Sequence, residues 1–593
     1  MAKKDDGLML AAQLQRQRNY REAARLYGDW LSKVPRSSKN KRVRDVAYSF
    51  GVLNEHLGDM GAALKGFERA REIDVHMWQA ALSLGRVYRA LGRPVLAVWT
   101  WQNALEAVRL QPNNSKGLLA LLNALADLLE ENEPTRALEC LQESLSIDVQ
   151  QTVVLERYLA LRRRQCLWPV IPQWLTDACP GQDLVFHLGP DMVMYEDCSP
   201  ADKTRVVKHF LNQRPVPANV RSLHGRKVGA GRVRLAYVVD DGIEPELAEW
   251  LLAQVQAHDR RAFDVYVLHN AYGALSPAGR QLLKQVDLHV PIAHLSDEQV
   301  SSRVRELEVD VLINPMGIHR GARWGVYAHQ AAPMQLAYGD RVGMDCVAGV
   351  THVLVDHMQA SSVDQFGGAT WRPKPLSVNT LYAVAVSSPG ADRWALRQSA
   401  GIAADAFVFG VGSPVAMIGT QSWALWMRLL RSRPEGVLWL CAPGTQVRDE
   451  LRRRAEELGV DRERIRFADV EGLSELACVA MPDVYVDTFP CSMGLMSLKR
   501  LAAGVPVLTC AGYSANGHAA TMHLRAADLG QWVAPGPDEL LDLAQGLASD
   551  AAALAQAYEA LEYAQRHSRL FDVPGAVAAL ETELKRAVLI TGA

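Results

Sequence analysis

The sequence lacks several patterns that would place it in a common functional class. Its nine cysteines are scattered between Cys140 and Cys510, without a CxxC pair or a histidine at ligand spacing, which argues against structural zinc and a disulfide framework. No uncharged apolar run approaches the roughly 18–20 residues of a membrane span, and the first residues contain no apolar signal-peptide core. With 64 basic and 66 acidic residues the formal charge is −2, which gives no basic field for nucleic acid. These absences predict a cytoplasmic protein with no membrane span and no nucleic-acid partner.

The common nucleotide-binding and hydrolase motifs are also missing. No GxGxxG opens the first α/β helix, and neither GxxxxGK[ST] nor GxSxG occurs, which argues against dinucleotide dehydrogenases, P-loop enzymes and α/β-hydrolases. The 593 residues are 49% apolar and 22% charged, which is ordinary globular composition over a length suited to about four domains.

The first 150 residues repeat with a period of 34. A Leu-Gly pair, two alanines and an aromatic residue recur at this step: Leu57-Gly58 and Leu91-Gly92, Ala63 and Ala97, Phe67 and Trp101, Ala70 and Ala104. A looser unit extends over residues 117–148, and a degenerate one over residues 8–34. A 34-residue helix–turn–helix period is typical of tetratricopeptide repeats (TPRs). We expect residues 1–150 to form a TPR-like α-solenoid whose groove binds a polypeptide; an ordinary helical bundle is the alternative.

Residues 151–230 are expected to form a helical linker. Residues 161–168 (LRRRQCLW) are predicted as the last helix of the solenoid, with the three arginines facing solvent. From residue 232 onward, short β-branched runs alternate with helical stretches, which is typical of βαβ units and parallel sheets. The expected strands are residues 233–239, 263–269, 281–290 and 309–313, followed by 407–410, 437–441, 465–467, 484–486 and 507–509.

The two series of strands predict two Rossmann-like lobes, residues 231–385 and 386–593, with a break near residues 380–400. In open parallel sheets the ligand lies beyond the carboxyl ends of the strands. The fold class is therefore expected to be α plus α/β, a TPR-like solenoid followed by two facing lobes. Facing lobes that lack the motifs above are typical of GT-B glycosyltransferases.

Two neighbouring segments carry a family resemblance. Residues 314–323 (NPMGIHRGAR) and 327–335 (YAHQAAPMQ) resemble, without gaps, the run N-x-x-G-x-T-K-G-A-R…F-A-L-R-P-A-P-I-Q of O-GlcNAc transferases. Further matches follow at residues 353–356, 437–440, 464–467, 483–488 and 503–508. The chain thus resembles bacterial O-GlcNAc-transferase-like, SPINDLY-related protein glycosyltransferases over most of residues 160–575.

The resemblance implies transfer of a sugar from a UDP-sugar to a protein side chain, with inversion and without a metal or other cofactor. The repeat groove would hold the acceptor or a partner protein, and the C-terminal lobe (residues 386–593) would hold the nucleotide. TPR arrays often pair, so a homodimer is a candidate assembly. The sugar, the acceptor and the glycosylated atom stay open.

The residues at the family's donor site differ here. Met417 stands at the position of a phosphate-binding lysine, residues 494–496 (GLM) replace a His-Thr-Thr run, and Lys499 replaces a ribose-binding aspartate. Glu244 stands at the position of a histidine in the loop after the first strand, and residues 341–346 (RVGMDC) replace Tyr-Pro-Gly-Thr-Ser-Gly.

The candidate site residues follow from these positions. The catalytic candidates are Asp241 and Glu244, which cluster with Asp240 after the first strand, and His329. The donor-binding candidates are Ser413, Met417, Ser492, Met493, Gly494 and Lys499, and the acceptor-side candidates are His319, Arg320 and Asp345. No metal ligand is expected. Structural roles are the alternatives: packing for Met417, solvation or capping for the loop acids, a turn before Pro414 for Ser413, a solvated helix end for Lys499 and an ordinary structural role for the histidines.

Two functions remain open at this point. The first is a protein glycosyltransferase in which backbone N–H groups at the start of a helix, near residues 492–494, hold the diphosphate together with Lys499. The second is a catalytically inactive relative that acts as a scaffold or partner subunit.

Overall fold

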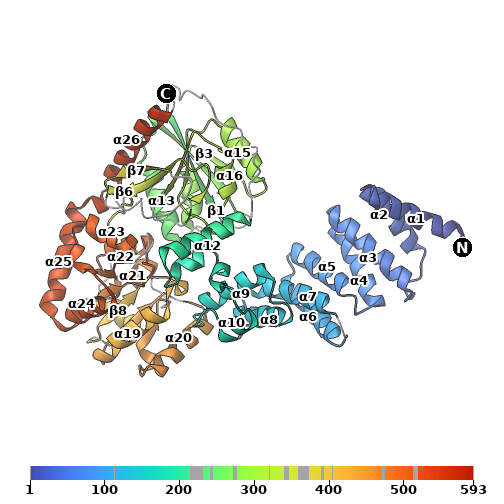
Figure 1. The fold of residues 1–593 in the computed structure, drawn as a ribbon, viewed down its shortest axis with the longest axis horizontal. Helices are drawn as coiled ribbons and strands as arrows, with labels where there is room; N and C mark the ends of the chain where they lie inside the picture. Colours follow the sequence, from blue (N-terminus) through green and yellow to red (C-terminus); the bar gives the residue numbers. More distant parts are fainter. Residues whose placement is uncertain are drawn as a thin grey trace. The chain divides into compact units, whose positions relative to one another are not determined.

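The computed structural model describes residues 2–591, apart from residues 112–113, 214–230, 241–244, 272–274, 276, 320, 339–342, 344–345, 358–372, 389–392, 404, 442, 470–473 and 512–517. It divides into two compact units, residues 1–162 with 177–180, and residues 163–176 with 181–593. The first unit is helical, and the second contains two parallel sheets covered by helices (Figure 1). The predicted fold class is confirmed.

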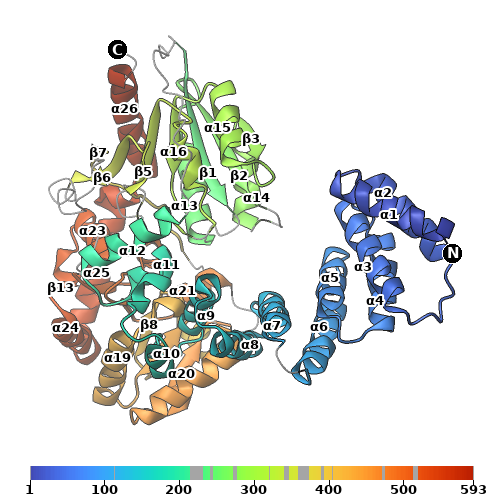
Figure 2. The same cartoon turned by 45° about the vertical axis from the view of Figure 1, so that its right-hand side comes forward.

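The first unit consists of antiparallel helix pairs. The pairs are α1 (Ala2–Arg16) with α2 (Tyr20–Ser32), α3 (Lys41–His56) with α4 (Met60–Ile73), α5 (Trp78–Ala90) with α6 (Pro94–Arg109), and α7 (Ser115–Leu129) with α8 (Pro134–Ile147). Gly58 and Gly92 adopt positive φ angles of 81° and 70° in the turns between paired helices, a conformation that L-residues with a Cβ rarely adopt. The successive pairs are visible in Figure 2.

Small and aromatic residues at the 34-residue step pack the pairs together. The repeated alanines and the aromatic residues Phe67 and Trp101 are buried. A Cβ on Gly51 would lie 2.6 Å from the Phe67 ring, and one on Gly85 would lie 2.0 Å from Trp101 Nε1. Each large ring therefore fills the space above a glycine of the preceding helix.

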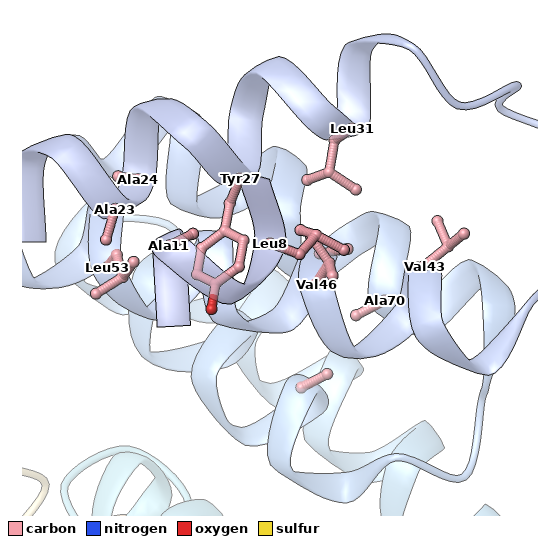
Figure 3. Close-up of a cluster of buried hydrophobic side chains, with 12 residues drawn as sticks. Leu8, Ala11, Ala23, Ala24, Tyr27, Leu31, Val43, Val46, Leu53 and Ala70 are labelled. Atoms are coloured by element: carbon pink, nitrogen blue, oxygen red, sulfur yellow. The ribbon is translucent and has the colours of Figure 1, made fainter. Parts of the chain in front are cut away.

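The first two pairs enclose a core of their own. Figure 3 shows Leu8 and Ala11 of α1, Tyr27 of α2 and Val46 of α3 gathered between the helices. The degenerate first unit predicted at residues 8–34 thus packs like the later ones.

A series of helices lies between the repeat helices and the first sheet. They are α9 (Thr152–Arg164), α10 (Gln173–Ala178), η1 (Leu184–His187), α11 (Gly189–Met192), η2 (Val193–Tyr195) and α12 (Pro200–Asn212). The prediction that the arginines of residues 161–168 face solvent is wrong for Arg163, which is 3% exposed. Its guanidinium contacts Glu196 Oε1 and the carbonyl oxygen of Ala416, each at 2.6 Å, and these two acceptors compensate its burial.

The N-terminal lobe contains a seven-stranded parallel sheet in the order β3-β2-β1-β4-β5-β6-β7. Its strands are β1 (Val233–Asp240), β2 (Phe263–Asn270), β3 (Leu288–Pro291), β4 (Val311–Asn314), β5 (Met334–Tyr338), β6 (His352–Asp356) and β7 (Lys374–Val378). Its helices are α13 (Pro245–Ala257), α14 (Pro277–Lys284), α15 (Asp297–Glu306) and α16 (Trp324–Ala328). The strand expected at residues 281–290 is wrong in its first half, which belongs to α14. Gly279 and Leu282 are buried there while Gln281 is exposed, which is the three-residue spacing of a helix face.

The C-terminal lobe contains a six-stranded parallel sheet in the order β10-β9-β8-β11-β12-β13. Its strands are β8 (Val408–Val411), β9 (Val437–Leu440), β10 (Ile465–Phe467), β11 (Val484–Val486), β12 (Val507–Cys510) and β13 (Val533–Ala534). The helices are α18 (Arg393–Ser399), η5 (Val415–Met417), α19 (Thr420–Ser432), α20 (Thr445–Glu457), η6 (Arg462–Arg464), α21 (Glu475–Ala480), α22 (Leu495–Ala502), α23 (Ala519–Ala526), η8 (Gly530–Trp532), α24 (Pro537–Ser549), α25 (Ala551–His567) and η9 (Arg569–Phe571).

A last helix, α26 (Val573–Thr591), packs against the N-terminal lobe. Figure 1 shows it in red beside the green strands. Val573 and Val577 are buried with Ala253 and Ala257 of α13, and the side chain of Glu581 contacts His258 at 3.0 Å. The polypeptide therefore crosses between the lobes twice. None of the helices in the described part of the chain combines the length and apolar character needed to cross a bilayer.

Candidate functional site

The strand order of each sheet indicates one position in each lobe where a ligand could bind. β1 lies between β2 and β4, and β8 lies between β9 and β11, so the order of successive strands reverses at these points. Loops that leave such a switch point diverge and open a crevice at the carboxyl ends of the strands, where ligands of open α/β sheets bind. The loops after β1, β4, β8 and β11 therefore delimit the candidate site.

In the C-terminal lobe, Asp487 organises the loop after β11. Its carboxylate is buried and accepts hydrogen bonds from the Thr509 hydroxyl at 2.7 Å and from the backbone N–H groups of Thr488 and Met493 at 2.8 Å. Burial raises the pKa of Asp487 to about 6, although these hydrogen bonds act in the opposite direction. This carboxylate holds residues 488–493 in place ahead of α22.

The hydroxyls of Ser413 and Ser492 bond within these same loops. Thr488 Oγ1 donates to the carbonyl oxygen of Cys491 at 2.9 Å, so the 2.8 Å contact between Ser413 and Thr488 has Ser413 as its donor. Ser492 Oγ accepts the N–H groups of Ala520 at 2.9 Å and Gly494 at 3.3 Å. Both serines thus join the loops of the switch point to each other or to α23.

Apolar side chains occupy the positions where the resemblance implied polar donor contacts. Met417, Leu495 and Met496 are all buried, and so is Met493. Gly494 precedes α22 with a φ of +54°, and nothing lies within 4 Å of where its Cβ would be. The start of α22 is therefore open at Gly494 and lined by apolar side chains.

Arg500 places a buried positive charge at the carboxyl end of β8. Its guanidinium donates to the carbonyl oxygen of Gly412 at 3.1 Å and to that of Met496 at 3.0 Å. Its Nε makes no hydrogen bond within the described residues, and Glu246 Oε1 lies 3.8 Å from its Nη1. A Cβ on Gly412 would approach this Nε to 2.8 Å, so glycine is needed there to admit the guanidinium.

Helices α13 and α22 bring the two lobes together beside this charge. Glu246 lies near Arg500, and Glu249 contacts Lys499 Nζ at 3.0 Å. Lys499 also contacts Glu475 at 2.5 Å. Burial lowers the pKa of Lys499, but the hydrogen bonds to its two carboxylate partners outweigh it and the net shift is upward. Lys499 is therefore charged and already neutralised.

In the N-terminal lobe, the switch point contains a histidine–carboxylate pair. His319 Nε2 lies 2.9 Å from Asp240 Oδ2, and the N–H of Gly321 donates to His319 Nδ1 at 3.2 Å. Because Nδ1 accepts, the ring proton is assigned to Nε2, but the 2.9 Å contact of Nε2 with Asp240 does not meet hydrogen-bond geometry. Asn314 shapes the same loop by accepting the N–H groups of Met316 and Gly317 at 2.7 and 2.8 Å.

The other predicted residues lie elsewhere. His329 follows α16 and precedes β5, and Arg305 at the end of α15 donates to its carbonyl oxygen, so it lies at the amino ends of β4 and β5. This separates it from Asp240 and His319 at the carboxyl ends. Asp241, Glu244, Arg320 and Asp345 fall outside the described residues. No group of three or more His, Cys, Asp or Glu side chains in the described part of the chain could hold a metal ion.

Sequence reasoning missed Arg500 and the partner of His319. Arg500 stands four residues after Met496, so both lie on the face of α22 that packs on the sheet, and this spacing was a usable signal. The pairing of Asp240 with His319 joins loops 79 residues apart in sequence, and periodicity carries no information about such a contact.

Comparison with known proteins identifies the lobe that carries Arg500. Residues 382–580 match glycosyl transferase family 41. The matched range covers most of the C-terminal lobe. The probable UDP-N-acetylglucosamine–peptide N-acetylglucosaminyltransferase SPINDLY of Hordeum vulgare is 24% identical over 352 residues, which cover 58% of this chain and 37% of that protein. The SEC protein of Arabidopsis thaliana, with the same probable activity in its name, is 23% identical over 295 residues, 48% of this chain and 30% of its own length.

The chain therefore spans less than two fifths of the length of these curated relatives. Among solved structures, a lysine-to-methionine mutant of the Thermobaculum terrenum O-GlcNAc transferase superposes with a TM-score of 0.62 at 20% identity, covering 94% of this chain and 99% of that one. The predicted GT-B arrangement of the two lobes and the resemblance to O-GlcNAc-transferase-like proteins are confirmed. Within the range that matches family 41, α22 and β8 form one wall of the candidate site.

Proposed function

We propose that this protein transfers a sugar from a nucleotide sugar, with a UDP-sugar as the donor, to a polypeptide side chain. The match to family 41 and the GT-B fold support the reaction class. The contacts of Glu246 with Arg500 and of Glu249 with Lys499 support a crevice between the lobes, because α13 begins directly after the loop that leaves β1. The two switch points thus face one crevice, one for the donor and one for the acceptor.

The position of Arg500 carries the proposal. Departure of a nucleoside diphosphate leaves negative charge on its terminal phosphate, and fixed positive groups lower the barrier by stabilising that charge. Met417 cannot supply such a group, and Lys499 is held by two carboxylates. Arg500 is bonded to carbonyl oxygens and has an Nε without a hydrogen bond among the described residues.

The reaction is proposed to invert the sugar without a metal ion. The acceptor oxygen or nitrogen would enter from the N-terminal lobe while the diphosphate leaves toward the C-terminal lobe, so that the new bond forms on the opposite face of the sugar. Arg500 and the N–H groups at the start of α22 would do the work of a cation. Ser413, Ser492, Met493 and Gly494 would contribute by shaping these loops.

The proposed protein partners are derived from the helical repeats of the first unit. We propose that the repeat groove binds the acceptor polypeptide or a partner protein, since stacked helix pairs offer an extended concave surface. A cytoplasmic location is part of the proposal, supported by nine cysteines that form no disulfide in the described part of the chain. A homodimer remains a candidate assembly, and sedimentation velocity would detect it.

Thermal shift with UDP tests the donor site. A ligand at one hundred times its Kd stabilises the folded state by about 2.7 kcal/mol. We expect the wild type to show this shift, Arg500→Met to lose most of it and Arg500→Lys to retain a part, because lysine keeps the charge. Arg428→Met is the matched control, since Arg428 forms an exposed pair with Asp538 on α19 and α24. Intact mass of co-expressed acceptor candidates, with and without this protein, tests transfer.

A scaffold without catalysis is the second candidate. It is favoured by the ion pairs of Lys499 and by the burial of Met417, Leu495 and Met496 at the donor positions. Unchanged melting with every nucleotide tried, together with unmodified acceptors, would establish the scaffold and refute the transferase.

A further inference from the structure

We infer that Lys203 of α12 is a second positive group of the donor site and binds the diphosphate of the nucleotide sugar together with Arg500. The inference rests on the proposed function, which takes its phosphate contacts from the C-terminal lobe alone. Lys203 comes instead from the helices that lie between the repeat helices and the first sheet.

Lys203 occupies a position on α12 where an apolar residue would be expected. The buried positions of this helix include Lys203, Val206, Val207 and Phe210, and their spacing is that of one helix face. Only 4% of Lys203 is exposed. Burial of an ammonium group costs free energy unless other groups compensate its charge, so packing alone does not account for a lysine here.

The described residues compensate this charge only in part. Lys203 Nζ donates a hydrogen bond to the carbonyl oxygen of Met194 at 3.2 Å, although an ammonium group has three N–H donors. The two nearby carboxylates are engaged with other partners. Glu196 contacts Arg163 at 2.6 Å, and Asp197 accepts a hydrogen bond from a side chain of α19 at 2.8 Å. Lys203 therefore has donor capacity left for an anion.

The pKa of Lys203 indicates the same imbalance. Burial is the largest influence and lowers the pKa of the ammonium group, whereas the ionisable groups around it, Cys198, Cys491, Asp197 and Glu196, raise it. The net shift is downward. An anion bound beside Nζ would reverse this shift, because it stabilises the charged form.

Backbone contacts place this ammonium group near the loop after β8. Two neighbouring carbonyl oxygens each bind a cation: that of Met194 accepts from Lys203, and that of Tyr195 accepts from Arg163 at 2.8 Å. Arg163 also donates to the carbonyl oxygen of Ala416 at 2.6 Å, in the short helix η5. The segment that holds Lys203 is therefore fastened to the loop that carries the first donor positions.

A further neighbour of Lys203 belongs to the loop after β11. Cys491 lies close enough to influence the pKa of Lys203. It is one of residues 488–493, which the buried carboxylate of Asp487 holds ahead of α22. The loops after β8 and β11 delimit the candidate site in the C-terminal lobe. We therefore expect a diphosphate at the start of α22 to contact Lys203 Nζ.

Helix α12 also contacts the N-terminal lobe. One turn after Lys203, Val207 packs against the loop after β5, where a Cβ on Gly343 would lie 2.5 Å from Val207 Cγ1 and 3.3 Å from Ile318 Cδ1. Figures 1 and 2 show α12 where the two lobes meet. Because this helix contacts loops at the carboxyl ends of both sheets, it borders the crevice in which the donor is proposed to bind.

Two cations divide the charge of the leaving group between them. A nucleoside diphosphate carries more negative charge than one guanidinium group can neutralise, and lysine binds phosphate as a compact positive charge. Arg500 and Lys203 approach the site from α22 and α12. Held in fixed positions, they stabilise the diphosphate as it leaves the sugar. Lys203 thereby lowers the stability of the empty protein and raises its affinity for the donor.

Calorimetry with UDP, inorganic pyrophosphate and uridine tests this role in the full chain. We expect Lys203→Met to weaken binding of UDP and pyrophosphate by about 10–100-fold, the usual effect of losing a hydrogen bond to a charged group. Uridine, which has no phosphate, should bind as it does to the wild type. Arg205→Met is the matched control, because Arg205 lies on the same helix but is exposed and pairs with Asp202; its UDP affinity should be unchanged.

Urea unfolding distinguishes binding from packing. Without ligand, Lys203→Met should be at least as stable as the wild type, because the substitution removes a buried charge whose partners are incomplete. Lys203→Gln is the second variant and keeps an N–H donor for the carbonyl oxygen of Met194. Since it lacks the charge, it should weaken UDP binding by a similar factor, and it decides the matter if the methionine variant does not fold.

The outcomes are distinct. A wild type that does not bind UDP refutes the proposed function and the role of Lys203 with it. If the wild type binds UDP and Arg500→Met weakens this binding, while both Lys203 variants keep the wild-type affinity, the role of Lys203 alone is refuted. Equal weakening of UDP and uridine in a less stable Lys203→Met shows that the lysine serves packing, and this also refutes the inference.

Discussion

The contacts of α26 with the N-terminal lobe predict that replacing Glu581 will strongly destabilise the docking of this helix. Glu581 accepts two hydrogen bonds in a buried setting, from His258 Nδ1 at 3.0 Å and from the N–H of Asp259 at 2.8 Å. The other ring nitrogen of His258 contacts the Tyr237 hydroxyl at 3.1 Å. The polar atoms of this cluster therefore satisfy one another, and removing Glu581 strands two donors away from water.

The magnitude follows from these two bonds. Hydrogen bonds to a charged acceptor contribute about 1.5–3 kcal/mol each, so Glu581→Ala should weaken the docking of α26 by about 3–5 kcal/mol. Glu581→Gln keeps an acceptor oxygen and should lose much less. Since each 1.4 kcal/mol is a factor of ten, the alanine variant should open at least about a hundredfold more often.

Hydrogen exchange followed by mass spectrometry measures this opening. Amides of residues 573–591 and of Asp259 should exchange about a hundredfold faster in Glu581→Ala. Glu583→Ala is the matched control, because Glu583 lies on the same helix but pairs only with the exposed Arg586, and such pairs contribute 0–1 kcal/mol. Equal acceleration in the two variants, or none in either, would refute the reasoning.

Two further effects are expected. Gly85→Ala should lower the free energy of unfolding of the helical unit by about 1–3 kcal/mol, since its Cβ would lie 2.0 Å from Trp101 Nε1. Gly61→Ala in α4 should not, because its Cβ would meet Asp59 Oδ1 at 3.6 Å, an ordinary van der Waals distance. Urea melts that rank the two variants the other way would contradict this account of the packing. Burial raises the pKa of Asp487 to about 6, so folding favours the protonated carboxyl group. The resulting stabilisation, up to about 3 kcal/mol, is present below about pH 4 and is lost as the pH rises through 6. Asp487→Asn should remove that part of the pH dependence of the melting temperature, and an unaltered dependence would count against it.

Features that repeat along the chain could be predicted from the sequence. The 34-residue step places Phe67 and Trp101 in equivalent buried positions. The β-branched runs at β1 and β4 became strands of a parallel sheet, where they are buried on both faces. The periodicity of apolar residues within an element follows directly from which of its faces are buried, so it can be seen in the sequence.

Contacts between distant segments could not be predicted in the same way. The residues next to Arg163 in sequence are typical of an exposed helix. Arg163 is nevertheless buried, because its guanidinium contacts the carbonyl oxygen of Ala416 and the carboxylate of Glu196. Likewise, Lys499 was expected to help hold the nucleotide sugar, and only the structure brings Glu249 and Glu475 to it. The partner that decides each residue's role lies far away in sequence.

The return of α26 has a consequence for how the protein is made. The sheet of the N-terminal lobe is complete once β7 leaves the ribosome, but the face of α13 that Val573 and Val577 cover stays exposed until the whole C-terminal lobe has been synthesised. Domains fold as they emerge from the ribosome. The N-terminal lobe therefore folds with this apolar face of α13 exposed to solvent, until α26 has been synthesised and covers it. Chaperone dependence during translation should therefore concentrate on that face and end when residues 573–591 appear.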